Sequence, residues 1–478
     1  MNLIDAAIIL PELALSVFAM TALVWCAYSR KPGTVQATFW ATSIVLFALA
    51  GWICFSPDLN RTAFGGMFAD DAFSRFAKTV ILVSSGIVLL LGQDFLKREQ
   101  LHSFEFPLLV AFAVLGMMLM VSARDLIVMY MGIELQSLSL YVLAAYNRSN
   151  VRSTEAGLKY FVLGALSSGL LLYGASLTYG FAGTTRFDGI ADAVSGGISH
   201  GLLYGLVFMV AGLAFKVSAA PFHMWVPDVY EGSPTPVTAL FATAPKVAAV
   251  LLLTRLLTEA FGHVHSDWGP IIAVLSIASM FLGAVAAIGQ TDFKRLMAYS
   301  SIAHMGYALI GVASGTEIGV RATLIYLAIY VAMNIGTFAF ILSMRREGSH
   351  VSDIKSLGMY SRQAPAKALA LLVLLFSLAG IVPMIGFLAK LYVFLAAIET
   401  GYVWLAVLGG LASVIGAYYY LRIVYFMYFG EEGPRLDVAV PGFCAGALMV
   451  SAAVTIVGVI NLFGITGFAE AAAAALAN

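Results

Sequence analysis

Five ionisable side chains stand in long apolar stretches of this sequence, where a charge is costly to place. An ionisable group at the centre of a membrane span raises the insertion free energy by about 2.5–3.5 kcal/mol. Carboxylate, ammonium and imidazole groups can take up and release protons, and rows of them at membrane depth are typical of proton paths. The indicated chemistry is therefore proton transfer along Glu134, Lys216, Lys246, His304 and Lys390.

Glu134 and Lys246 lie near the middle of their apolar segments. Glu134 is about ten residues into DLIVMYMGIELQSLSLYVLAAY, and Lys246, which follows Pro245, is about eleven residues into the segment that begins near Thr235. At about 1.5 Å per residue, both lie too deep for their side chains to reach the interface. The alternative for Glu134 is a helix-packing role in which neighbouring hydroxyls satisfy the carboxylate.

Lys216 and Lys390 stand beside expected helix breaks. Pro221 follows Lys216 by five residues, and Pro383 precedes Lys390. A proline removes a backbone donor and clashes with the preceding turn, so we expect both helices to break there. Irregular backbone at membrane depth needs a cover of protein or water. The alternative for Lys216 is a side chain that extends to the interface.

His304 lies in RLMAYSSIAHMGYALI, among serines and tyrosines. Neutral imidazole both donates and accepts a proton, so we favour a relay over the alternative of a satisfied core histidine. Other ionisable residues are given structural roles. We expect loop-ordering or interfacial positions for His223, Asp228, Glu231, Lys78 and Asp71.

Glu134 and Lys216 together suggest a switch. Burial favours the neutral form of a lysine, whereas a nearby carboxylate favours the charged form. If the carboxylate moved away, Lys216 would release its proton, with Lys246 as the next acceptor. Between these two lysines, we expect the run PFHMWVPDVYEGSPTP to carry the chain across the surface.

The composition places these residues in a membrane. Of the 478 residues, 61% are hydrophobic and only 11% are charged, against about 25% charged in soluble domains. The net charge is zero, which gives no sign of a nucleic-acid-binding surface. The three cysteines lack metal-ligand spacing, and no nucleotide-binding glycine motif opens a helix, so no cofactor is expected in this chain.

The apolar segments predict an all-α polytopic membrane protein with about fourteen transmembrane helices, since each span needs about 20 apolar residues. The predicted spans begin near Leu3, Gln36, Arg75, Phe104, Asp125, Ala156, Ser199, Thr235, Asp267, Arg295, Ile318, Lys367, Tyr402 and Gly442. Sixteen Lys and Arg residues fall in loops after odd-numbered spans and six in the others. The positive-inside bias then predicts that both termini face outside.

The order of the charged spans suggests a repeat. Glu134 and the broken helix with Lys216 occupy spans five and seven, and His304 and the broken helix with Lys390 occupy spans ten and twelve. An offset of five spans makes the second unit inverted, which is a transporter design. The match is approximate, because Lys216 precedes its proline and Lys390 follows its own.

Four segments resemble one known family. PFHMWVPDVYEGSPTPVTALFAT, LMAYSSIAHMGY, MGIELQSLSLYVL and GFLAKLYVF are similar to the antiporter-like subunits of respiratory complex I. PDVYEGSPTPVT and a lysine at position 390 single out one member among the sister subunits. The resemblance implies two inverted five-helix repeats, in 104–262 and 263–430, with flanking helices in 1–103 and 431–478. It also implies that Glu134, Lys216, Lys246, His304 and Lys390 form a central polar axis.

The resemblance assigns the redox chemistry to other chains. FMN, iron–sulfur clusters and quinone are expected in partner subunits, and NADH is oxidised there. The implied partners are an antiporter-like neighbour on one side, small quinone-side subunits on the other, and lipids. The alternative function is a subunit of a multisubunit sodium/proton antiporter. A purely structural scaffold is a third possibility, which the buried charges disfavour.

Overall fold

Helices make up nearly all of the computed structural model, which describes residues 3–29, 33–57, 60–433, 435–437 and 442–477. The helices up to the first break are α1 (Leu3–Ile8), α2 (Leu10–Tyr28), α3 (Thr34–Phe55), α4 (Ala72–Arg98), α5 (Glu105–Ser122), α6 (Leu126–Ala144), α7 (Val151–Ala182), α8 (Phe187–Val194) and α9 (His200–Val217). Two small hairpins pair β1 (Arg61–Ala63) with β2 (Phe68–Asp70) and β3 (Arg345–Arg346) with β4 (Ser349–His350), both antiparallel.

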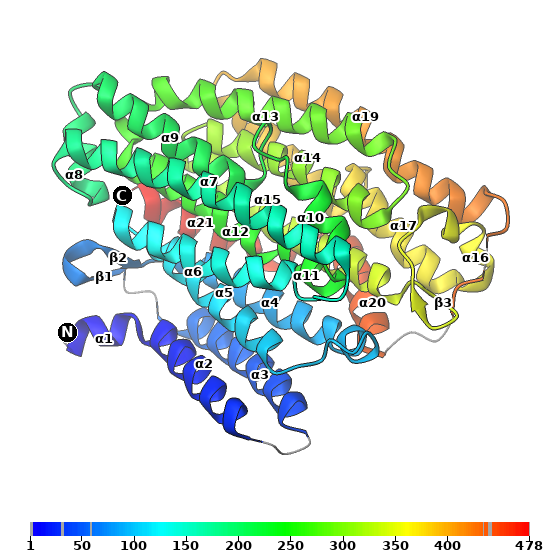
Figure 1. Ribbon diagram of the computed structural model, residues 1–478. Coiled ribbons are helices and arrows are strands. Elements are labelled where there is room, and N and C mark those ends of the chain that lie inside the picture. Colours follow the sequence, from blue (N-terminus) through cyan, green and yellow to red (C-terminus); the bar gives the residue numbers. More distant parts are fainter. Residues whose placement is uncertain (1–2, 30–32, 58–59, 434, 438–441, 478) are drawn as a thin grey trace.

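The second half of the chain continues the bundle (Figure 1). Its helices are α10 (Val226–Gly232), α11 (Thr235–Phe241), α12 (Ala244–Arg255), the π-helical η2 (Leu256–Ala260), α13 (His265–Ile288), α14 (Phe293–Ala313), α15 (Glu317–Ser343), α16 (Tyr360–Gln363), α17 (Pro365–Ala379), α18 (Ile385–Glu399), α19 (Val403–Phe429), α20 (Gly442–Val457) and α21 (Ile465–Ala477). In Figure 1, α1 and the end of α21 lie at the same end of the bundle.

The predicted fold class, an all-α polytopic membrane protein, is confirmed. Within the described residues, twelve helices are long and apolar enough to cross a membrane, or thirteen if the bent pair α20–α21 counts as one span. The expected total of fourteen and the inverted repeats stay predictions. The last segment differs from a single straight span, because α20 and α21 meet at an angle of 106°.

The centre of the bundle is formed by the helices that are apolar on every face. The most apolar stretch of Thr235–Ala260 is 100% buried, and those of α14 and α15 are 94% and 89% buried, whereas α2 is only 22% buried. A helix that is hydrophobic all round belongs in the interior. These three central segments carry Lys246, His304, Tyr307, Tyr326 and Tyr330.

Aspartates fix the starts of several helices. Asp71 accepts a hydrogen bond from the backbone N–H of Ser74 at 2.7 Å, and Asp125 accepts one from Ile127 at 2.8 Å. Such N-caps satisfy backbone donors that a helix leaves unpaired. They fix where α4 and α6 begin, and α6 is the helix that carries Glu134.

Two charged residues near span ends are buried inside the bundle. Lys78 is 2% exposed, and its Nζ lies 2.7 Å from Oε1 of Glu12 on α2; its interfacial depth stays a prediction. Arg255 is fully buried at the end of α12. Its guanidinium donates to both carboxylate oxygens of Asp71 at 2.8 Å and to Glu259 at 2.7 Å. Local spacing does not reveal Asp71 as a partner of Arg255, since the two residues are 184 positions apart in the sequence.

Arg255→Met is expected to lower the free energy of unfolding by about 3–5 kcal/mol, because it leaves the buried Asp71 carboxylate without its main counter-charge. Thermal unfolding of the purified protein, followed by tryptophan fluorescence, measures the change. Arg321→Met is the control, since the Arg321–Glu470 pair is wide, at 3.7 Å, and its side chains are 34% and 65% exposed. Equal melting temperatures for the two variants would contradict the stabilising role of Arg255.

Candidate proton-transfer site

Lys216 lies in the last turn of α9 and points at α6. Its Nζ donates to Ser137 Oγ at 2.8 Å and to Tyr141 OH at 3.3 Å, and lies 5.6 Å from the centre of the Tyr141 ring. The side chain lies inside the bundle, because Lys216 is only 6% exposed. A buried ammonium is thus held by two neutral hydroxyls.

Glu134 shares the α6 face that binds Lys216. Positions 134, 137 and 141 follow helical spacing, so Glu134 is one turn from Ser137. Glu134 and Lys216 interact electrostatically, but no ion pair within 4.0 Å joins them in the described part of the chain. One Glu134 oxygen, Oε1, is buried without a hydrogen-bond partner there. The expected pair is therefore near but not in direct contact.

Lys246 lies in the first turn of α12 and reaches the break after α9. Its Nζ donates to the backbone oxygen of Val217 at 3.2 Å and contacts Ser218 Oγ, and it lies 5.2 Å from the Trp225 ring centre. Val217 is the last residue of α9, so the ammonium caps the negative end of that helix. Lys246 thus contacts the two residues that follow Lys216 in the chain, Val217 and Ser218.

A backbone irregularity positions Lys246. α11 ends at Phe241 and α12 begins at Ala244, because Thr243 between them is not helical, with φ −121° and ψ −100°. Pro245 then occupies the first turn of α12, where a missing N–H is tolerated. Pro245 therefore starts a new helix after the break instead of bending a continuous one.

The chain between the lysines does not run over the surface as expected. Trp225, Val226 and Tyr230 are at most 3% exposed, and the middle of this run forms the short helix α10. Trp225 Nε1 donates to Phe215 O at 3.1 Å, and the N–H of Ala220 donates to Ser279 Oγ on α13 at 2.8 Å. Protein therefore covers part of the break, as irregular backbone at membrane depth requires, whereas Met224 beside it is 62% exposed.

Asp228 and Glu231 tie α10 to its neighbours. Both carboxylates accept from Arg295 at 2.8 Å, and Asp228 also accepts from Lys159 at 2.8 Å. His223 is half-buried in the segment before α10. The ordering role predicted for Asp228 and Glu231 agrees with these contacts.

Lys390 occupies the second break in the same way as Lys246 occupies the first. Its Nζ donates to the backbone oxygen of Ala379, the last residue of α17, at 2.9 Å and to Ser413 Oγ at 2.8 Å. It also lies 4.7 Å from the Tyr307 ring centre. The geometric counterpart of Lys390 is therefore Lys246 and not Lys216. This accounts for the mismatch between the lysines and prolines in the sequence.

His304 is enclosed by tyrosines in the centre of the bundle. Its Nδ1 lies 2.7 Å from Tyr326 OH, and its Nε2 lies 3.1 Å from Tyr420 OH. Tyr330, whose ring centre is 5.3 Å from that of His304, donates to Ser301 Oγ at 3.0 Å. Both ring nitrogens thus face hydroxyls, which donate or accept as the imidazole requires.

Aromatic hydroxyls extend the row between the charged groups. Tyr230 lies 6.0 Å from Lys246 by ring centre and interacts electrostatically with Tyr330, which contacts His304. On the far side, Tyr307 lies between His304 and Lys390. The site residues that the sequence analysis missed are Tyr141, Ser218, Tyr230, Tyr326, Tyr330, Ser413 and Tyr420. Two of these residues could have been found from the sequence, because Tyr326 and Tyr330 are four residues apart in an otherwise apolar span.

Gly380→Ala is expected to disturb Lys390 directly. Gly380 has a φ of +84°, and an added Cβ would lie 2.9 Å from Cδ and 3.1 Å from Nζ of Lys390. The backbone conformation alone costs about 1–2 kcal/mol for a residue with a Cβ. Gly401→Ala is the matched control, because Gly401 also has φ +84° but open space around it. Proton translocation should fall in Gly380→Ala only; equal loss in both variants would rule out an effect through Lys390.

The fold and the site together define a multi-pass membrane protein of the antiporter type, built around buried protonatable groups. A model of the family described as NADH:quinone oxidoreductase/Mrp antiporter, transmembrane, matches residues 123–416. The chain belongs to this family, which confirms the resemblance seen in the sequence.

Two curated relatives match over their whole length. Subunit N of NADH-quinone oxidoreductase from Jannaschia sp. is 59% identical over 99% of both chains. The subunit of the same name from Rhodobacter capsulatus is 56% identical over 99% of both.

Solved structures share the fold. A chain of respiratory complex I from Thermus thermophilus is 30% identical, with a TM-score of 0.83 over 96% of this chain and 98% of that one. A chain of the Mrp complex from Dietzia sp. also has a TM-score of 0.83, over 100% of this chain and 98% of that one. At 22% identity, the latter shows the fold alone.

Proposed function

We propose that this chain translocates protons as a membrane subunit of an NADH:quinone oxidoreductase in a bacterial inner membrane. One observation carries the proposal: Lys216, Lys246, His304 and Lys390 are all buried and each contacts a hydroxyl. The high identity to oxidoreductase subunits supports the choice of complex.

The proposed central step moves a proton across the first helix break. An N–H bond of the Lys216 ammonium breaks and leaves a neutral amine, while a new N–H bond forms on neutral Lys246. The charge of Glu134 controls the step, because a nearby carboxylate holds the proton on Lys216. Tyr230 and the Tyr330–Ser301 pair lie between Lys246 and His304, and Tyr307 lies between His304 and Lys390.

The driving energy is proposed to come from partner subunits, which would hold FMN, iron–sulfur clusters and quinone. An antiporter-like neighbour and small quinone-side subunits are the proposed contacts within the membrane. The proposed orientation places both termini on the periplasmic side, since most Lys and Arg residues lie in the opposite loops.

A subunit of a sodium/proton antiporter is the second candidate, because the family model covers both kinds of protein. The curated relatives above 50% identity are oxidoreductase subunits, which favours the first.

Co-purification separates the two functions. We expect NADH dehydrogenase activity and bound flavin to accompany the affinity-tagged chain from detergent-solubilised membranes. Sodium/proton exchange by the purified assembly without NADH, together with the absence of flavin, would contradict the proposal.

A further inference from the structure

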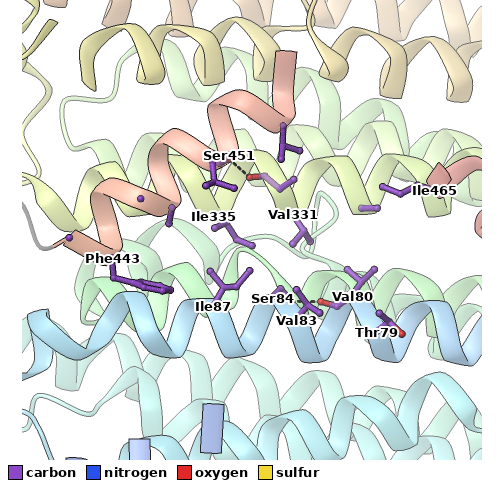
Figure 2. A pocket seen from close by; sticks show the side chains of 17 residues that line it. Thr79, Val80, Val83, Ser84, Ile87, Val331, Ile335, Phe443, Ser451 and Ile465 are labelled. Carbon is purple, nitrogen blue, oxygen red and sulfur yellow. Dashed lines mark hydrogen bonds between the residues drawn. The ribbon is translucent and has the colours of Figure 1, made fainter. Parts of the chain in front are cut away.

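Two hollows outside the proton-transfer site differ in polarity. The larger, with a volume of about 600 Å³, lies between α4 and α20 (Figure 2). Apolar side chains form most of its lining, and the hydroxyls that Figure 2 labels, those of Thr79, Ser84 and Ser451, already donate to backbone carbonyls. This groove therefore offers no path to a proton.

The smaller hollow is a polar pocket of about 360 Å³, where the end of α4, the α10–α11 corner and the start of α14 meet. Among its lining residues, Glu99 and Ser349 are exposed, whereas Ser233 and Thr235 are each 1% exposed. The pocket thus leads from the surface into the bundle. In the proposed orientation, its open side faces the cytoplasm.

Water is the occupant that suits this pocket. Its charged lining residues are of both signs, which favours neither an anion nor a cation; they are Glu99, Arg152, Glu231, Asp292 and Lys294. Two further lining atoms, Ser233 Oγ and His350 Nδ1, are buried without a hydrogen-bond partner among the described residues. Buried polar atoms in that state are usually bonded to water, and the volume holds several molecules of about 30 Å³ each.

His350 stands between this pocket and the interior of the bundle. Its Nε2 lies 3.0 Å from Thr235 Oγ1, and its Nδ1 is the atom without a described partner. Burial, Lys294 and Arg345 lower the pKa of His350 to about 3, although the Met344 carbonyl acts in the opposite direction. The ring is therefore neutral at pH 7, and a neutral imidazole accepts a proton on one nitrogen and donates from the other.

The α10–α11 corner separates the pocket from the buried row. Glu231 and Ser233 line the pocket, and Lys294 holds the corner by donating to their backbone oxygens at 2.6 and 3.0 Å. Tyr230, which precedes Glu231, is fully buried, and its ring centre lies 6.0 Å from Lys246 Nζ. Adjacent residues of one short helix thus face the pocket and the row.

Hydroxyls of α11 lead in the same direction. Thr235, the partner of His350, and Thr238 are three residues apart and so share a face of α11. Thr238 Oγ1 donates to the backbone oxygen of Tyr230 at 2.9 Å. Polar groups therefore continue from the base of the pocket to Tyr230.

We propose that this pocket is the entrance through which protons reach the buried row, with His350 as the relay at its base; this rests on the proton-translocating function proposed above. Nδ1 of His350 takes a proton from a hydronium ion in the pocket, which becomes water, and Nε2 releases its own proton to Thr235 Oγ1. The threonine passes its hydroxyl proton inward toward Tyr230. The imidazole is then neutral again, as the other tautomer.

A removable plug tests the entrance. Inverted vesicles present the cytoplasmic side, so a bulky, membrane-impermeant methanethiosulfonate is added to the Ser349→Cys complex, and attachment is confirmed by mass spectrometry. We expect labelling to remove most of the NADH-driven dye quenching, and dithiothreitol, which cleaves the label off, to restore it. Glu347→Cys is the control, because Glu347 is exposed on the same hairpin but outside the pocket lining. Full labelling of Ser349→Cys without loss of quenching, or no labelling from this side, would overturn the proposal.

His350→Ala tests the relay itself. We expect the rate of proton translocation to fall at least about tenfold and to recover in part when imidazole is added to the buffer, which a purely structural lesion would not do. His200→Ala, on an exposed histidine at the start of α9, should show neither effect. A loss that imidazole does not restore, or no loss, would contradict the role of His350. Because Ser349 is exposed, its labelled variant tests the pocket even if His350→Ala assembles poorly.

Lys246→Met, measured in the same vesicles, separates this proposal from the proposed function. Loss of quenching in Lys246→Met but not in labelled Ser349→Cys would overturn the entrance alone. No loss in either would overturn proton translocation by this chain and the entrance with it.

Discussion

Lys246→Met is expected to reduce NADH-driven proton translocation by about 100-fold or more, the scale of effect of removing a positioned proton donor and acceptor. Lys246 is the group that joins the first helix break to the centre of the bundle, through contacts with Val217 and Ser218 and proximity to Tyr230. Methionine keeps an unbranched chain of similar length but cannot carry a proton. Quenching of a pH-sensitive dye in inverted membrane vesicles measures the initial rate.

NADH oxidation should slow in the same variant, because redox chemistry coupled to a blocked proton path is held back. The amount of assembled complex must be measured in parallel, since the Val217 carbonyl loses a buried donor at a cost of about 1–3 kcal/mol. Lys355→Met removes an exposed lysine and serves as the control. Near-normal dye quenching by a fully assembled Lys246→Met complex would show that Lys246 carries no proton.

Glu134→Gln and Lys216→Ala are each expected to lower the rate of proton translocation at least about tenfold. The rate of the double variant should be no lower than that of the less active single variant. Residues that act as a unit show such non-additivity. The physical reason is that Glu134 acts on Lys216 electrostatically, one helical turn from the Ser137 and Tyr141 hydroxyls that bind the ammonium. Once Lys216 is gone, the carboxylate has no proton to control.

The same vesicle assay measures all three variants, with Glu155→Gln as the control because Glu155 is an exposed carboxylate on α7. Losses that multiply in the double variant would mean that the two residues act independently. Such a result would rule out the Glu134–Lys216 switch, but it would not bear on the role of Lys246 in proton transfer.

Local chemistry made the helix breaks predictable. Pro221 and Pro383 cannot continue a helix, and α9 and α17 end just before them, at Val217 and Ala379. The five ionisable residues stood out because a charge in an apolar segment is rare for a physical reason that holds in any membrane protein. The class of fold followed from the same apolar segments.

Contacts between residues far apart in the sequence could not be predicted from local sequence patterns. Lys246 caps a helix that ended 29 residues earlier, whereas Lys390 caps the helix just before its own. The two lysines look unrelated in the sequence and become equivalent only in three dimensions. Lys78 also has a partner that its own span does not reveal, because Glu12 approaches it from α2.

The ratio of protons translocated to NADH oxidised shows whether protons cross the membrane through the buried row. The ratio is measured in vesicles that hold the wild-type complex, the Lys246→Met complex or the Lys355→Met control at equal amounts of assembly. We expect an unchanged ratio in the control and a lower ratio in Lys246→Met for whatever NADH oxidation remains. A wild-type ratio in Lys246→Met would contradict it, because every proton would then cross by another route.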